Sequence, residues 1–116
     1  RVASRGLGDV YKRQQLDLVK KYFSNNLFGG MLWFDVKGGD KSAIKLMNNI
    51  KRPWSLCENL GATESIITAC AVMTHANMLP EDRAKVGITD GFIRVSCGIE
   101  DVEDLIFALE EALSIE

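Results

Sequence analysis

The sequence contains little of what several common protein classes require. Cysteine occurs only three times, widely spaced and never as a CxxC pair, which argues against a disulfide framework and against a zinc site. No apolar run approaches the roughly 18 residues that a membrane span needs. A pI near 5.4 gives no support to nucleic-acid binding. What is present, 116 residues that are 47% hydrophobic and 26% charged, is typical of a single globular domain.

Basic residues are concentrated in residues 1–14, RVASRGLGDVYKRQ, although the whole chain has a net charge of −2. This segment shows neither a helical period nor a strand alternation. It resembles adapter-like leaders found on many unrelated environmental reading frames, so we interpret it as non-native sequence that is loosely packed or disordered. The alternative is a basic tail that binds a partner. We exclude it from the fold prediction and treat residues 15–116 as the domain.

Regular patterns begin at Gln15 and predict an α+β fold. Residues 15–26 are expected to form the last part of a helix, because Leu16, Val19 and Phe23 recur at helical spacing. Alternation and glycine punctuation predict strands over 31–37, 54–58, 64–68 and 92–97. Helices are expected from a cap at Asp40 to Pro53, over 80–85, and from about Asp101. We therefore expect a small antiparallel or mixed sheet of about four strands, with helices packed on one face.

The two longer expected helices are amphipathic. The apolar stripe of the first consists of Ala43, Ile44, Met47 and Ile50. The face of the last that should pack on the sheet consists of Val102, Leu105, Ile106, Leu109 and Leu113.

One charged residue stands inside an otherwise apolar strand. Arg94 lies in the middle of FIRVSC, and burying a guanidinium without an anionic partner is costly. Two partners are equally compatible with the residues alone. Arg94 could form a structural ion pair with a carboxylate such as Glu64, or it could bind a substrate carboxylate through a bidentate fork. The single histidine, His75, is better interpreted as a structural hydrogen bonder than as a catalyst.

Three ordered blocks resemble one known family. GITDGFIRVSCGIEDVEDLIFALEEAL, FGGMLWFDVKGG and NLGATESIITACAVMTHA are similar to signatures of the Cys/Met-metabolism (transsulfuration) enzymes, which depend on pyridoxal 5'-phosphate (PLP). The resemblance covers the chain from about Phe28 to its end. It implies the small carboxyl-terminal domain of the fold-type I architecture. It also implies that Arg94 holds the substrate α-carboxylate, with the Asn59–Leu60–Gly61 turn beside it.

The chain departs from the family signatures at a few positions. Asn59 stands where the family commonly has Ser, so the pose of the substrate would differ. Cys70 and Val72 replace the usual Pro and Ser, and Trp33 replaces a small residue. These departures place the chain outside the best-known branches of the family.

The resemblance also implies a longer parent enzyme. Such a parent would be a cytoplasmic homotetramer that performs elimination or replacement at Cβ or Cγ of a sulfur amino acid or an O-acylhomoserine. Its PLP would be bound mainly by a large domain, including the Schiff-base lysine, that this chain lacks. Five lysines of this chain lie in sequence contexts that do not match the family's Schiff-base lysine motif, and we interpret them as surface charges. They are Lys37, Lys41, Lys45, Lys51 and Lys85. We therefore predict no catalytic and no metal-binding residue here, and no activity for the chain alone. The alternative is a non-enzymatic dimerisation or interaction module in which Arg94 forms a structural ion pair.

Overall fold

The computed structural model describes residues 3–4, 21–22 and 29–115 of the chain. Among these residues the strands are β1 (Ala3–Ser4), β2 (Met31–Asp35), β3 (Ser55–Leu56), β4 (Ile66–Ala69) and β5 (Phe92–Ser96). The helices are α3 (Gly39–Asn49), α4 (Pro80–Lys85) and α5 (Val102–Ser114). The expected α+β class is therefore confirmed, as is each of the four expected strands, although β3 is only two residues long.

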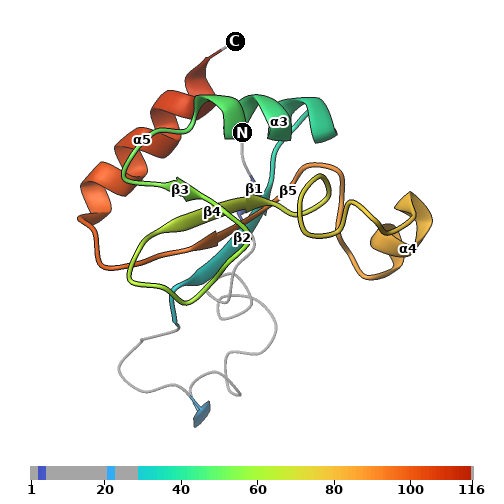
Figure 1. The fold of residues 1–116 in the computed structure, drawn as a ribbon, viewed down its shortest axis with the longest axis horizontal. Coiled ribbons are helices and arrows are strands. Elements are labelled where there is room, and N and C mark those ends of the chain that lie inside the picture. Colours follow the sequence, from blue (N-terminus) through green and yellow to red (C-terminus); the bar gives the residue numbers. More distant parts are fainter. Residues whose placement is uncertain (1–2, 5–20, 23–28, 116) are drawn as a thin grey trace.

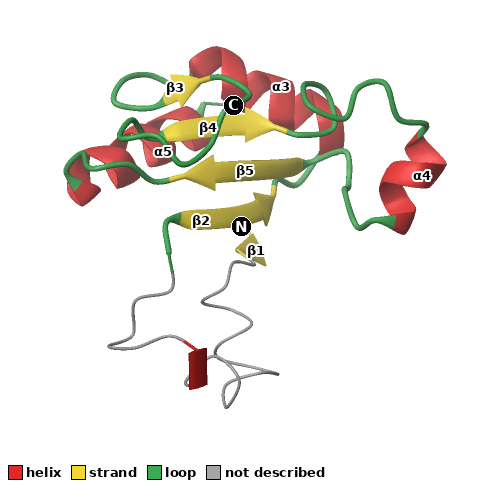
Figure 2. Cartoon of the chain, turned by 60° about the horizontal axis from the view of Figure 1, so that its bottom comes forward, coloured by secondary structure: helices red, strands yellow, loops and turns green. Residues whose placement is uncertain are grey.

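The strands form one mixed sheet in the order β1-β2-β5-β4-β3 (Figure 2). Neighbouring strands run antiparallel, except that β3 and β4 run parallel. β5 lies in the middle, where it is hydrogen-bonded along both edges, to β2 and to β4. In this register Arg94 has Trp33 of β2 opposite it on one side and Thr68 of β4 on the other.

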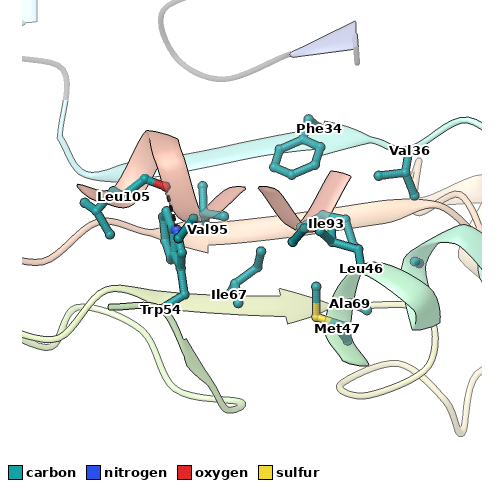
Figure 3. Packing of buried hydrophobic residues seen from close by; sticks show 13 residues of the cluster. Phe34, Val36, Leu46, Met47, Trp54, Ile67, Ala69, Ile93, Val95 and Leu105 are labelled. Atoms are coloured by element: carbon teal, nitrogen blue, oxygen red, sulfur yellow. Dashed lines mark hydrogen bonds between the residues drawn. The ribbon is translucent and has the colours of Figure 1, made fainter. Parts of the chain in front are cut away.

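Helices α3 and α5 cover one face of the sheet, while α4 lies beyond one end of it (Figure 1). Alternation along β5 directs Ile93 and Val95 toward the two helices, where they join Ile67 of β4 in the core (Figure 3). Each large apolar side chain buried there contributes about 1.5–3 kcal/mol. The residues between them in β5 therefore project from the opposite face, which we call the open face.

One hydrogen bond fixes α5 over the sheet. The indole Nε1 of Trp54 donates to the carbonyl oxygen of Leu105 over 2.9 Å, and both residues are buried (Figure 3). Trp54 immediately precedes β3, so this bond connects the edge of the sheet to the first turns of α5. Asp101 caps the helix by accepting a hydrogen bond from the backbone N–H of Glu103. The predicted start of the last helix is confirmed.

Two predicted details of the helices are wrong. Asp40 does not cap α3, because the helix begins at Gly39 and its N-cap is Gly38, at a φ of 100° that favours glycine. Ile44 is 44% exposed, and Leu46 occupies the buried position instead. The reason is that α3 is rotated about its axis relative to the predicted stripe.

The packing face of α5 is also shifted. Leu105 is buried with Ala108 and Ala112, whereas Val102 and Ile106 are 59% and 48% exposed. The buried side of α5 therefore consists of one large and two small apolar residues. The displaced apolar side chains of α5 border a hollow of about 420 Å³ that Leu32 of β2 also lines.

Two predictions fall mainly on residues outside the described part of the chain. Of residues 1–14, only Ala3–Ser4 is described, and it pairs with β2 at the edge of the sheet. The interpretation of residues 1–14 as a non-native leader stays a prediction. Of the helix expected over 15–26, only Lys21 and Tyr22 are described, and both are helical. Within the described ranges, no helix has the length and apolar character needed to cross a bilayer.

Candidate substrate-binding site

Arg94 lies on the open face with an unsatisfied donor. The residue is half-buried, and its Nη2 atom is buried without a hydrogen-bond partner among the described residues. Glu64, the carboxylate considered as a structural partner, is exposed and accepts a hydrogen bond from Ser55 Oγ at 3.5 Å. No ion pair joins Arg94 to another described residue. A buried guanidinium nitrogen in this state is a strong site for an anionic ligand.

The segment that connects β3 to β4 extends along the open face next to Arg94. Thr68, which flanks Arg94 in the sheet, donates from Oγ1 to the carbonyl oxygen of Cys57 over 2.6 Å. Ser96, two residues after Arg94 on the same face, accepts a hydrogen bond from the backbone N–H of Gly61 over 3.0 Å. Figure 1 shows this connection looping out on the side of the sheet away from α3 and α5. The fold therefore brings Arg94 and the Asn59–Leu60–Gly61 turn into one neighbourhood.

The turn itself is exposed. The side-chain oxygen of Asn59 accepts a hydrogen bond from the backbone N–H of Leu60 over 2.9 Å, and Leu60 is 52% exposed. Gly61 adopts a φ of 72°, a conformation that a residue with a Cβ rarely takes. The backbone N–H groups of Leu60 and Gly61 are thus both engaged in hydrogen bonds, and the turn is open to solvent.

A second set of hydrogen bonds ties the end of this segment to the residues after β5. The carboxylate of Glu100 accepts from the backbone N–H of Ser65 over 2.9 Å and from its hydroxyl over 2.6 Å. The Ser65 hydroxyl in turn accepts from the backbone N–H of Gly98 over 2.8 Å. The hydrogen bonds from Ser65 lower the pKa of Glu100 below its usual range. The network therefore favours an ionised carboxylate at Glu100.

Aromatic side chains lie on the β2 side of Arg94. The rings of Trp33 and Phe92 stack with their centroids 4.9 Å apart and their planes 15° from parallel. Beyond them, Thr89 donates a hydrogen bond to the carboxylate of Asp35. Trp33, one of the departures from the family signature, is thus a half-buried side chain directly across from Arg94 in the sheet.

The remaining candidate groups are structural or exposed. His75 Nδ1 forms a hydrogen bond with Thr74 Oγ1 at 2.7 Å. All three cysteines are free; Cys70 is buried, whereas Cys57 and Cys97 are half-buried. Burial and the nearby charge of Glu100 raise the pKa of the Cys97 thiol. The five lysines predicted to be surface charges are all exposed. Among the described residues, no group of His, Cys, Asp and Glu could hold a metal ion.

The sequence predicts Arg94 and the turn as site residues, but it does not predict the side chains that hold the turn on the sheet. Ser65, Thr68, Ser96 and Glu100 carry no pattern that marks them as a network, since they come together only when β4 pairs with β5. The available signal was indirect: all four lie inside the two sequence blocks that contain the candidate site residues.

The comparisons with known proteins agree on one class. The family described as Cys/Met metabolism PLP-dependent enzyme matches residues 8–114. An L-methionine gamma-lyase of Fusobacterium nucleatum subsp. polymorphum is 43% identical over 97 residues, which cover 84% of this chain and 24% of that protein. A cystathionine gamma-lyase of Dictyostelium discoideum is 46% identical over 86 residues, which cover 74% of this chain and 22% of that protein.

A solved structure shares the fold as well. The crystal structure of a putative O-acetylhomoserine (thiol)-lyase from Campylobacter jejuni, which contains N'-pyridoxyl-lysine-5'-monophosphate, superposes with a TM-score of 0.79 at 34% identity. The match covers 88% of this chain and 24% of that one.

The fold is that of a small α+β domain from a PLP-dependent enzyme of fold type I. The chain belongs to the Cys/Met metabolism family of PLP-dependent enzymes. It spans about a quarter of the length of the curated relatives that it matches.

Proposed function

We propose that this chain is the small domain of a PLP-dependent enzyme of sulfur amino-acid metabolism, and that it supplies the site for the substrate α-carboxylate. One observation carries the proposal: Nη2 of Arg94 is buried on the open face without a partner among the described residues. The reaction proposed for the whole enzyme is elimination or replacement at Cβ or Cγ of the substrate, in a cytoplasmic homotetramer.

The described residues do not form a cradle for PLP. Each described lysine is exposed to solvent, whereas a lysine that bonds a cofactor covalently is activated by desolvation or by a neighbouring charge. We infer that the PLP-binding lysine belongs to a segment outside this chain and that the chain alone is inactive. When bound, PLP supplies the electron sink for the reaction at the α-carbon.

The role of Arg94 follows from its shape and its surroundings. A planar guanidinium binds a carboxylate through two parallel hydrogen bonds, which fix the direction of the carboxylate as well as its position. Fixing the plane and position of the carboxylate also fixes the position of the α-carbon, which restricts the orientations that its other bonds can take. The side-chain NH2 group of Asn59, which is exposed, would offer a further hydrogen-bond donor. Arg94 would thus contribute to orientation in addition to affinity.

The proposal is tested in the full-length enzyme with Arg94→Lys and Arg94→Ala. A charge-assisted hydrogen bond is worth about 1.5–3 kcal/mol, so losing one bond of the fork in Arg94→Lys should lower kcat/KM by about 10- to 150-fold. Arg94→Ala should lose more, while PLP stays bound in both variants. If Arg94 instead belongs to a structural ion pair, Arg94→Ala would lower Tm and leave the kinetics of the folded enzyme nearly unchanged.

A further inference from the structure

The segment that carries the Asn59–Leu60–Gly61 turn is attached to the sheet at both ends. Near its start, Cys57 and Gly61 are held by the side chains of Thr68 and Ser96. Near its end, the backbone N–H of Ile99 donates to the carbonyl oxygen of Thr63 over 3.0 Å. The last attachment is the Ser65–Glu100 pair.

That last attachment is the most specific of these contacts. Ser65 is fully buried, and its hydroxyl has one proton, which it donates to Glu100 while its oxygen accepts from the N–H of Gly98. Hydrogen bonds arranged in such a chain polarise and strengthen one another. Gly98 cannot be replaced without disturbance, because a Cβ there would collide with the Thr63 carbonyl and the Glu64 backbone. The backbone at Gly98 therefore lies against the backbone of residues 63 and 64, at a distance that only glycine allows.

We propose that Glu100 is a positioning residue, which through Ser65 holds the Asn59–Leu60–Gly61 turn against the open face beside Arg94. This inference rests on the proposed function, because the position of the turn matters for activity only if the turn and Arg94 share one carboxylate. Glu100 lies four residues after Ser96, and its partner Ser65 lies four residues after Gly61, so their contact is a second link between the segment and the residues that follow β5. Losing Glu100 would leave Arg94 in place and remove one of the attachments at the end of the segment, which would loosen the turn.

The first test measures amide hydrogen exchange by NMR in the 116-residue chain. In Glu100→Ala, we expect the amides of Gly61 and Ser65 to exchange at least about ten-fold faster, while the amides in the middle of β5 stay as protected as in the wild type. Glu100→Gln should give a smaller effect, since its side-chain oxygen still accepts a hydrogen bond. Glu103→Ala removes an equal charge from the first turn of α5 and serves as the control.

Two exchange results would overturn the inference. One is no acceleration at Gly61 and Ser65 in Glu100→Ala. The other is an equal acceleration throughout β5, which would mean that Glu100 contributes only to global stability. If Glu100→Ala does not fold, Glu100→Gln decides by the same criteria.

The second test uses the full-length enzyme and separates this inference from the proposed function. We expect Glu100→Ala to raise KM for the amino-acid substrate about ten-fold while kcat changes less than about three-fold, because Arg94 still orients the carboxylate. An unchanged KM, or an equal loss in kcat, contradicts the positioning role. If the wild-type enzyme turns over no sulfur amino acid, the proposed function fails, and the exchange result still decides whether Glu100 holds the turn.

Discussion

Trp33 and Arg94 stand directly opposite each other in the antiparallel pair of β2 and β5, so both project from the open face. The indole of Trp33 stacks on Phe92, the neighbour of Arg94 two positions earlier on the same strand and the same face. The guanidinium is therefore bordered by an aromatic pair on one side and by Thr68, which is bonded to Cys57, on the other. This arrangement limits the directions from which an anion could approach Arg94.

The aromatic pair should stabilise the sheet measurably. We expect Trp33→Ala to lower the free energy of unfolding by about 1–3 kcal/mol, since the stacking and the buried area are both lost. Trp33→Phe should retain most of this contribution. Urea denaturation measures the effect, with Phe107→Ala as the control: Phe107 is 67% exposed on α5, and its loss should change stability by less than about 0.5 kcal/mol. Equal effects at both positions would contradict the stacking account.

The rotation of α5 predicts opposite outcomes for two neighbouring residues. Leu105 is buried against the sheet, so Leu105→Ala should cost about 2–5 kcal/mol through lost contacts and a cavity. Ile106 is 48% exposed, so Ile106→Ala should cost less than about 1 kcal/mol in this chain. The same denaturation experiment compares them. A loss at Ile106 as large as the loss at Leu105 would mean that both side chains pack on the sheet, as the face predicted from the periodicity requires.

The pKa of Glu100 predicts how stability depends on pH. Because the folded state lowers the pKa of Glu100, the unfolded state binds the proton more readily, and stability rises with pH. The contribution is complete above the unfolded pKa of about 4.3 and is lost as the pH falls through the lower folded value. We expect the wild type to be more stable than Glu100→Gln at pH 7, with the difference shrinking on acidification. Thermal unfolding between pH 7 and pH 3 tests this; a difference that grows toward low pH would contradict it.

The strong patterns in the sequence were enough to place the elements. Alternation around Arg94 and the 3.6-residue period after Asp101 correspond to β5 and α5. The side of α5 that packs was not predictable, because its apolar stripe is broad enough to pack through either half. The buried half contains Ala108 and Ala112, and small residues gain contacts only after the helix has docked closely.

Arg94 was a recognisable candidate because a lone cation inside an apolar strand demands an anion. The contact between Ser65 and Glu100 was not recognisable, because it spans 35 residues and depends on the pairing of β4 with β5. The start of α3 was not predictable either, because a pair of glycines can form a turn before a helix or begin the helix itself. Gly38 and Gly39 both have positive φ values, and α3 starts at Gly39 and not after the expected Asp40 cap.

The claim that Arg94 binds the substrate carboxylate is tested most directly by measuring, in the full-length enzyme, how strongly activity depends on that carboxylate with and without Arg94. Among L-methionine, L-cystathionine and O-acetyl-L-homoserine, the compound that is turned over is compared with its carboxamide, in the wild type and in Arg94→Ala. If Arg94 binds the carboxylate, the wild type should prefer the acid by about 10- to 150-fold in kcat/KM, and Arg94→Ala should lose most of that preference. An undiminished preference for the acid in Arg94→Ala would contradict the account, because it would place the carboxylate elsewhere.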